Sequence, residues 1–242
     1  MRVAEPDIAA CERNQRHRYE AQATVTGGAR WRSGDLEFIA PGPDGDVMLA
    51  FPTRIEVSDA EAGLERAWSL GYRSIGAWLR AEGDGVALAA LGFESGWQPH
   101  WMSARLADIP PVNDRRIQLE DATPEYDGRG RAMLTLTEER PRRAWHAVAR
   151  IDGRIAGRAW IYSDGETAGV YDMDVWPRFR RQGIGRGLLA TLATAARDAG
   201  HRWAVLNATP DGERLYRGSR FSSIGHGATW WKHREDGRGG RI

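Results

Sequence analysis

A glycine loop flanked by arginines, residues 180–186, has the residue types and spacing to bind an anion. Gly183 and Gly185 lack a Cβ and accept positive φ angles, so backbone N–H groups there can approach an anion closely. The loop lies between a strand-like run, residues 170–175, and a helix-like run, residues 186–199, whose dipole adds to the attraction. Arginine side chains place fixed positive charge on the same spot. The sequence therefore predicts a phosphate-binding loop.

The spacing of this loop differs from two common phosphate-binding motifs. No Gly-Lys-Ser/Thr follows, as a Walker loop requires, and the G-x-G-x-x-G spacing of a dinucleotide fingerprint is absent. Arg180-x-x-Gly183-x-Gly185 instead resembles the Q/R-x-x-G-x-G/A motif of the GNAT acyltransferases, which binds the pyrophosphate of acetyl-coenzyme A. A solvated arginine-rich turn is the alternative. The resemblance implies cofactor contacts along the whole loop: Arg180, Arg181, Gln182, Gly183, Ile184, Gly185 and Arg186.

The elements that must position the loop can be predicted on both sides of it. Residues 144–151 and 154–162 predict a hairpin. After the loop, apolar residues at helical spacing predict a helix with one buried face, and Gly200 is its stop signal. Residues 203–209 predict a short strand, and residues 221–231 predict strands with Gly225 and Gly227 between them.

This order of elements resembles the GNAT core over residues 115–233. In that family the strand before the loop diverges from the next strand, and the pantetheine arm lies in the gap. The resemblance implies backbone contacts from Met173, Asp174 and Val175, with the Val175 N–H donating to the thioester carbonyl. It also implies that Asn207, at the end of the next strand, contacts the pantetheine or an ordered water. Helix capping across the following turn is the alternative role for Asn207.

The first half of the chain repeats the pattern of the second. Residues 47–52 resemble residues 172–177, and each run precedes a helix closed by a glycine, Gly71 or Gly200. In place of the arginine-glycine loop, the first half carries Glu56 and Asp59, which would repel a pyrophosphate. We therefore expect an α/β (α+β) chain of two GNAT-like domains, each a mixed, mostly antiparallel central sheet flanked by helices. Residues 1–110 would form a degenerate domain, and residues 111–242 the coenzyme A-binding domain.

Transfer of an acetyl group to an amine requires a base, a donor to the oxyanion and a proton for the departing thiolate. The resemblance places Tyr216 near the coenzyme's sulfur as the general acid, with core packing as the alternative. Asp172 and Asp174 share one face of a strand. Inward carboxylates on a central strand are costly unless they serve a purpose, so both are candidate bases. Asp172 is favoured because Asp174 lies closer to the expected bulge and the thioester; structural pairing with arginines is the alternative.

Composition limits the remaining choices. The 34 basic and 33 acidic residues give a net charge of +1, which argues against nucleic acid as the main partner. The single cysteine and the spacing of His146, His201 and His226 predict no metal site. No stretch approaches a membrane span and the N-terminus lacks a signal-peptide core, so a cytoplasmic location is expected. A charged run in an early helix, residues 12–18, predicts a solvated face. A monomer and a homodimer are both open.

The leading hypothesis from these residues is an N-acyltransferase that uses acetyl-coenzyme A on a primary amine of a small molecule. Tandem GNAT-like folds also include enzymes that use aminoacyl-tRNA, and the arginines near Arg140, Arg142 and Arg143 would be the residues that meet its phosphates. The third hypothesis is a sensor that binds acyl-coenzyme A without turnover. Retention of Tyr216 and the strand carboxylates favours chemistry over sensing.

Overall fold

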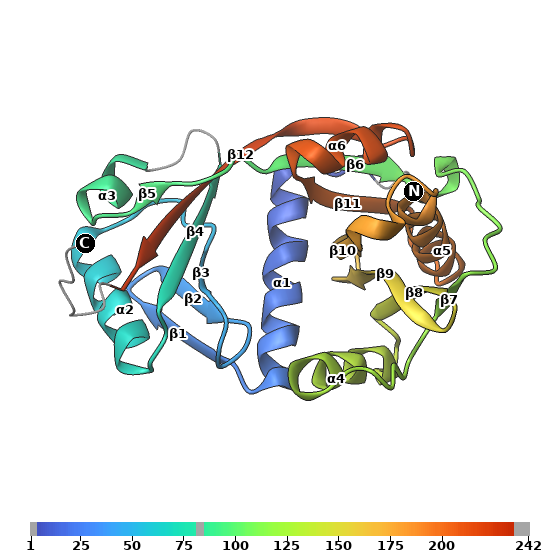
Figure 1. The fold of residues 1–242 in the computed structure, drawn as a ribbon. Coiled ribbons are helices and arrows are strands. Elements are labelled where there is room, and N and C mark those ends of the chain that lie inside the picture. The colour runs from blue at the N-terminus through green and yellow to red at the C-terminus, as the bar shows by residue number, and fades with distance from the viewer. Residues whose placement is uncertain (1–3, 81–84, 235–242) are drawn as a thin grey trace. The chain divides into compact units, whose positions relative to one another are not determined.

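The computed structural model describes residues 4–80 and 85–234 of the 242-residue chain. The chain divides into two compact units that do not follow the order of the sequence. Unit 1 combines the N-terminal segment up to Arg18 with His100–Gly225, and unit 2 combines Tyr19–Pro99 with the segment that starts at His226. The units therefore do not separate at the predicted boundary between residues 110 and 111. Helix α1 (Ile8–Thr26) begins in unit 1 and ends in unit 2 (Figure 1).

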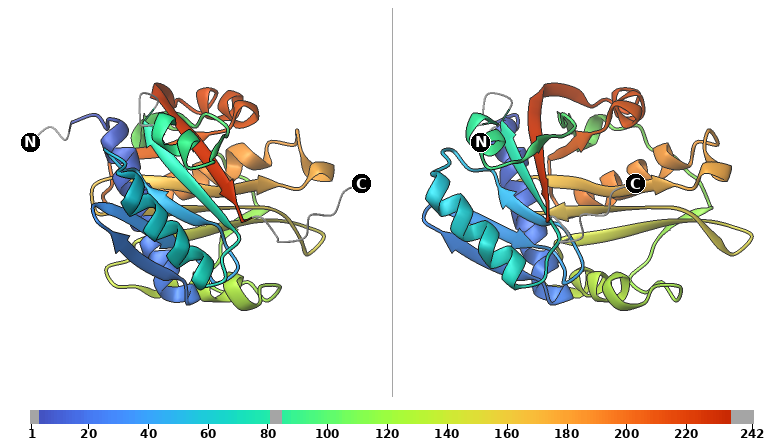
Figure 2. Two further views of the ribbon diagram at one scale, coloured as in Figure 1. Left: turned by 90° about the vertical axis from the view of Figure 1, so that its left-hand side faces the viewer. Right: turned by 60° about the vertical axis from the view of Figure 1, so that its left-hand side comes forward.

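Unit 1 holds a six-stranded mixed sheet in the order β6-β11-β10-β9-β8-β7. All neighbours in it run antiparallel except β10 and β11, which are parallel. In Figure 2 the long yellow-to-orange strands β8 to β10 lie side by side. The predicted hairpin and the strand after the loop helix are confirmed. The strands are β6 (His100–Arg105), β7 (Ile117–Leu119), β8 (Ala144–Ile151), β9 (Arg154–Ser163), β10 (Ala168–Val175) and β11 (Trp203–Ala208).

Helix α5 (Ile184–Asp198) covers one face of this sheet, and its apolar stripe forms the core of unit 1 with inward residues of β8, β9 and β10. Leu188, Leu189 and Leu192 are fully buried there, as the helical spacing predicts. Gly200 takes a φ of +94° directly after the helix, which confirms the predicted stop. The smaller helices of unit 1 are η1 (Leu106–Asp108), α4 (Gly128–Leu134), η2 (Thr135–Glu138), η3 (Pro177–Phe179) and α6 (Pro210–Arg217).

Unit 2 repeats this plan on a smaller scale. Its strands lie in the order β1-β2-β3-β4-β12, with β5 beside β12, and β3 and β4 are the parallel pair. Helix α2 (Val57–Ser69) joins that pair and packs on β1 and β2, as Figure 1 shows. The remaining elements are β1 (Ala29–Ser33), β2 (Leu36–Ala40), β3 (Val47–Ala50), β4 (Ser74–Arg80), α3 (Gly85–Ala90), β5 (Glu94–Ser95) and β12 (Ser222–His233).

One strand of each sheet comes from the other half of the sequence. β6 follows the helices of unit 2 but pairs with β11 of unit 1, from Trp203 opposite Arg105 to Ala208 opposite His100. β12 follows the helices of unit 1, and its part from Gly227 to His233 pairs with β4 of unit 2. The C-terminal run is thus a single strand that contains Gly225 and Gly227, not the separate strands expected. The fold class is as predicted: two mixed, mostly antiparallel sheets flanked by helices.

Candidate active site

The arginine-glycine loop forms the N-terminus of α5, as predicted. Gly183 is the N-cap and has a φ of +79°, a conformation that strains any residue with a Cβ. The first bond of the helix runs from the Gly187 N–H to the Gly183 carbonyl (3.0 Å), so the N–H groups of residues 184–186 have no partner within the helix. Apart from buried Ile184 and half-buried Gly185, the loop is exposed. Its backbone is therefore available to an anion.

Arginine side chains at the loop donate hydrogen bonds to backbone carbonyls, and others stay without an ion pair within the described part of the chain. Arg116, which pairs with Asp114 at 2.7 Å, donates to the Gln182 carbonyl (3.0 Å). The Nε of Arg180 donates to the Val175 carbonyl (2.9 Å), so this arginine braces the preceding strand. Among the residues that the structure describes, Arg181 and Arg186 form no ion pair. These two side chains keep their charge available at the loop.

The strand before the loop separates from its parallel neighbour, as the resemblance implied. β10 and β11 share only the positions Ala168–Ala204 and Gly169–Val205 in their ladder. β10 then continues to Val175, paired only with β9 on its other edge. In unit 2 the equivalent strands β3 and β4 stay paired from Val47–Ile75 to Ala50–Trp78. A free strand edge therefore exists in unit 1 beside the loop, and its counterpart in unit 2 is closed.

A β-bulge directs backbone groups of β10 toward this free edge. The register shifts between Tyr171 and Asp174, and Asp172 inside the bulge has a φ of +48°. Beyond the bulge, the Trp176 N–H donates to the Ala156 carbonyl (3.0 Å). Because backbone groups alternate between the two edges of an antiparallel strand, the N–H of Val175 points away from β9. That N–H faces the edge that β11 has left.

Asp172 and Asp174 are both exposed rather than inward, so the burial cost invoked from the sequence does not apply, and the bulge between them breaks the alternation that would place them on one face. The sequence also misplaced the bulge, which contains Asp172 rather than lying nearer Asp174. Asp172 pairs with Arg18 on α1 (2.8 Å), whose side chain is only 4% exposed. Asp174 forms no ion pair with any residue of the described ranges. This reverses the ranking from the sequence: Asp174 is the available carboxylate.

Tyr216 lies on α6 with its ring in the core of unit 1, next to Phe221. Its hydroxyl is 3.8 Å from the sulfur of Met173, on the strand with the free edge. Burial raises the pKa of the phenol to about 12, so the hydroxyl keeps its proton near neutral pH. Tyr216 therefore packs in the core, which is the alternative role considered from the sequence, and it also lies close to the open edge of β10.

Helix α1 is more buried than its charge pattern predicts. Glu12, Gln15 and Arg18 are at most 8% exposed, so the expected solvated face is wrong for these positions. Gln15 accepts from the amide of Asn207 on β11 (2.6 Å), and Arg18 holds Asp172 on β10. Helix α1 thereby contacts both of the strands that diverge, β10 and β11. The capping alternative for Asn207 fails, because Thr209 caps α6 by accepting from the Gly212 N–H (3.2 Å).

Two groups near the site were missed from the sequence. His100 lies between Glu213 of α6 (3.1 Å) and Ser223 of β12 (2.6 Å), and so ties the helix that carries Tyr216 to β6. On the face of the sheet opposite α5, Arg158 donates to the hydroxyl of Tyr126 (3.2 Å). His100 and Arg158 contact residues that are far away in the sequence, which a sequence pattern does not reveal. Only the alternation along β9 could have indicated which face of the sheet Arg158 occupies.

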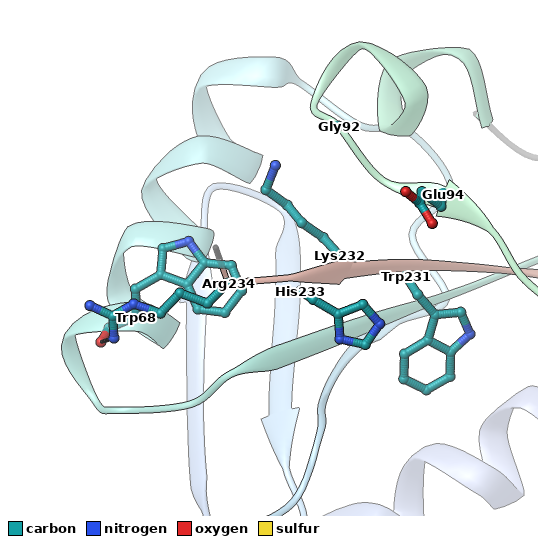
Figure 3. A pocket seen from close by; sticks show the side chains of 7 residues that line it. All are labelled: Trp68, Gly92, Glu94, Trp231, Lys232, His233 and Arg234. Atoms are coloured by element: carbon teal, nitrogen blue, oxygen red, sulfur yellow. Dashed lines mark hydrogen bonds between the residues drawn. The ribbon is translucent and has the colours of Figure 1, made fainter. Parts of the chain in front are cut away.

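A separate pocket of about 590 Å³ lies in unit 2, at the edge of β12 beyond β5. Figure 3 shows Lys232 and His233 leaving opposite sides of the strand. Lys232 donates to the Leu91 carbonyl (2.6 Å) and Arg234 to the Trp68 carbonyl (3.1 Å). Lys232 and Arg234 are thus bound to backbone carbonyls, and the side chains that line this pocket do not converge on one point.

The described part of the chain contains no group of three or more His, Cys, Asp or Glu side chains that could hold a metal ion. Within the same residues, no helix combines the length and apolar character that crossing a membrane requires.

The first half of the chain differs from the second at the position of the loop. Arg54 and Glu56 pair with each other where the second half has its glycines.

Part of the chain matches a known family, and the whole fold is similar to solved structures. Residues 113–218 match the sequence model of the acetyltransferase (GNAT) family. The fold is similar to that of a GCN5-related N-acetyltransferase from Kribbella flavida, at 16% identity over 89% of this chain and 94% of that one, with a TM-score of 0.61.

Two further solved structures have the same fold. A tandem GNAT protein from the clavulanic acid biosynthesis pathway has 18% identity over 82% of this chain and 78% of its own, with a TM-score of 0.55. A GCN5-related N-acetyltransferase-like protein from Streptococcus suis has 12% identity over 93% of this chain and 99% of its own, also with a TM-score of 0.55. No curated protein matches the sequence.

Proposed function

We propose that this chain, whose residues 113–218 match the GNAT acetyltransferase model, moves an acetyl group from acetyl-coenzyme A to a primary amine of a small molecule. One observation carries this proposal: an exposed loop of free N–H groups and arginines lies directly after a strand whose edge is open. A diphosphate suits the loop, and an extended thiol-bearing arm suits a strand edge with unpaired backbone groups.

The residues that would hold the coenzyme fit its chemistry. Backbone N–H groups of Gly185 and Arg186, with the side chains of Arg181 and Arg186, match the pyrophosphate. The free edge of β10 at Met173 and Val175 matches the amides of the pantetheine arm, whereas the backbone groups of Asp174 face β9 by the same alternation. Asn207 contacts Gln15, so its amide would approach the arm only by sharing that hydrogen bond. The loop residues Arg180, Gln182, Gly183 and Ile184 would shape the cradle through their backbone.

The reaction needs no covalent enzyme intermediate. The amine nitrogen attacks the thioester carbonyl, a C–N bond forms, and the C–S bond breaks. Asp174 takes the amine's proton directly or through water, and the Val175 N–H donates to the oxyanion. Tyr216 gives its proton to the departing thiolate. Asp172 is less suited as the base, since Arg18 already neutralises it.

Release of free thiol from acetyl-coenzyme A with a panel of primary amines tests this proposal. We expect Tyr216→Phe to lower kcat about a hundredfold or more, because a positioned acid contributes that much. Its KM for acetyl-coenzyme A should stay within about twofold, since the hydroxyl contacts only the Met173 sulfur within the described residues. Tyr72→Phe is the control, because Tyr72 is likewise buried but belongs to the core of unit 2.

Calorimetry with coenzyme A separates the outcomes. If coenzyme A produces no heat of binding, the proposal is refuted. Binding without thiol release across the amine panel would instead favour the acyl-coenzyme A sensor. Turnover that survives both Tyr216→Phe and Asp174→Asn would keep the function and reject these roles.

A further inference from the structure

Arg158 occupies a central position beside the proposed base. It lies in β9, and its neighbour Ala159 belongs to the core under α5, so the Arg158 side chain leaves the opposite face. The residue directly across the ladder is Asp174. Side chains paired in this way have Cβ atoms about 5 Å apart. Arg158 and Asp174 therefore border the same small area of the sheet.

Aromatic groups fix the guanidinium of Arg158 in place. Its central carbon lies 5.5 Å from the ring centre of Tyr126 and 5.9 Å from that of Trp176. One terminal nitrogen donates to the hydroxyl of Tyr126 (3.2 Å), and that hydroxyl also contacts Nε2 of His146 at 3.2 Å. His146 is fully buried and stacks on Trp160 at 4.4 Å. The arginine is thus held before any ligand binds.

No anion of the described chain neutralises this arginine. No carboxylate of residues 4–80 or 85–234 forms an ion pair with Arg158, and its Nε is buried without a hydrogen-bond partner. A guanidinium has five N–H donors. The neighbouring strand offers a contrast: Arg150 pairs with both Glu120 and Glu125. Leaving a buried charged donor unpaired costs free energy, which an incoming anion would recover.

We propose that Arg158 binds a carboxylate of the acceptor, so that the substrate is a small amine that also carries a carboxylate group. This inference rests on the proposed function and specifies its acceptor. Arginine binds carboxylates through two parallel hydrogen bonds, and its planar fork suits that geometry better than lysine does. Asp174 receives the amine end of the same molecule.

The geometry also limits the length of the acceptor. Arg158 and Asp174 are direct cross-strand neighbours, so amine and carboxylate should be separated by a few bonds. The Trp176 and Tyr126 rings flank the guanidinium and would border the carbon chain between the two charged ends. Amino carboxylates fit this description, whereas polyamines lack the group that Arg158 would bind.

Paired acceptors test the inference on the full chain. The probes are glycine, β-alanine, 4-aminobutanoate and phenylalanine, each compared with its own primary carboxamide. Binding is measured by calorimetry in the presence of coenzyme A, and thiol release is measured with acetyl-coenzyme A. We expect at least one carboxylate to exceed its amide at least thirtyfold in affinity and in kcat/KM, because the carboxamide cannot form the charged, two-pronged pair with Arg158.

Two variants locate the effect. Arg158→Gln should abolish the preference for the carboxylate, so that each acid and its own amide bind and react alike. Arg158→Lys should keep part of the preference, since it retains charge but loses the fork. Arg154→Gln is the matched control, because Arg154 is an exposed arginine at the start of the same strand.

The results distinguish this inference from the function on which it rests. Carboxylate-selective binding that depends on Arg158 but yields no thiol release would support the acceptor site and reject the transferase. Turnover with equal use of acids and amides would support the transferase and overturn this inference. A preference that survives Arg158→Gln, or no binding and no turnover of any probe, would also overturn it.

Discussion

Two carboxylates on one strand, Asp172 and Asp174, differ in what surrounds them. Asp172 lies in a β-bulge and is neutralised by a buried arginine from α1, whereas Asp174 lies after the bulge beside Arg158, which no carboxylate of the described residues pairs. The positive charge of Arg158 also favours the neutral amine of a nearby acceptor. At the scale of single residues, availability rather than residue type therefore selects Asp174 as the proposed base.

His146 should make stability depend on pH. Burial lowers the pKa of His146 to about 4 from an ordinary value of 6.5. The unfolded chain therefore binds more protons than the folded one between these values, and stability present above pH 6.5 is lost as the pH falls toward 4. His146→Phe removes this titration while keeping a ring on Trp160. Urea unfolding at pH 7 and pH 4.5 should show a smaller loss in the variant, by about 2–3 kcal/mol.

Exposed His233 provides the comparison, since its replacement by Gln leaves the buried site intact. Equal loss of stability on acidification in the parent and His146→Phe would contradict this account.

At the scale of elements, the start of α5 determines how the loop can bind. The helix begins with a glycine in the left-handed conformation, which turns the chain sharply after η3 and aligns the next N–H groups along the helix axis. β10, η3 and α5 therefore form a strand-loop-helix unit that local backbone preferences alone can specify. Arg116 and Arg180 then brace it by donating to the carbonyls of Gln182 and Val175.

Gly183→Ala should weaken binding of coenzyme A about tenfold. The left-handed conformation costs about 1–2 kcal/mol for a residue with a Cβ, and relaxing it would rotate the N–H groups of the loop. Calorimetry with coenzyme A measures the change. Gly153→Ala is a matched control, because Gly153 also has a positive φ (+73°) with open space around it but lies in the β8–β9 turn.

Both variants should lose similar stability, and only Gly183→Ala should lose affinity. Unchanged affinity in Gly183→Ala would show that this loop does not bind the pyrophosphate.

At the scale of the whole molecule, the two units depend on each other's chain segments. β11 pairs with β6 along its entire length, and β4 pairs with β12. Each sheet is therefore completed by a strand from the opposite half of the sequence. Met102 and Ala104 of β6 are buried in the core of unit 1. Neither half of the sequence contains a complete sheet.

Residues 111–242 expressed alone should therefore fail to fold cooperatively. The fragment lacks β6 and the buried α1 residues, which leaves the edge of β11 and part of the core exposed. We expect no sharp thermal transition and no binding of coenzyme A. Co-expression with residues 1–110 should restore both, since that fragment supplies β6. A fragment 111–242 that unfolds cooperatively and binds coenzyme A by itself would contradict this dependence.

The sequence by itself determined the features that depend on near neighbours. Gly183 and Gly200 mark the ends of α5 through their backbone freedom, and apolar spacing sets the face that α5 buries, so the loop, the helix and the β8–β9 hairpin were all predictable. The tertiary structure decided which distant segments meet: β6 with β11, Arg18 with Asp172, Gln15 with Asn207, and Arg158 with Tyr126. Such pairings depend on packing and charge between residues far apart in the chain, which local propensities do not encode.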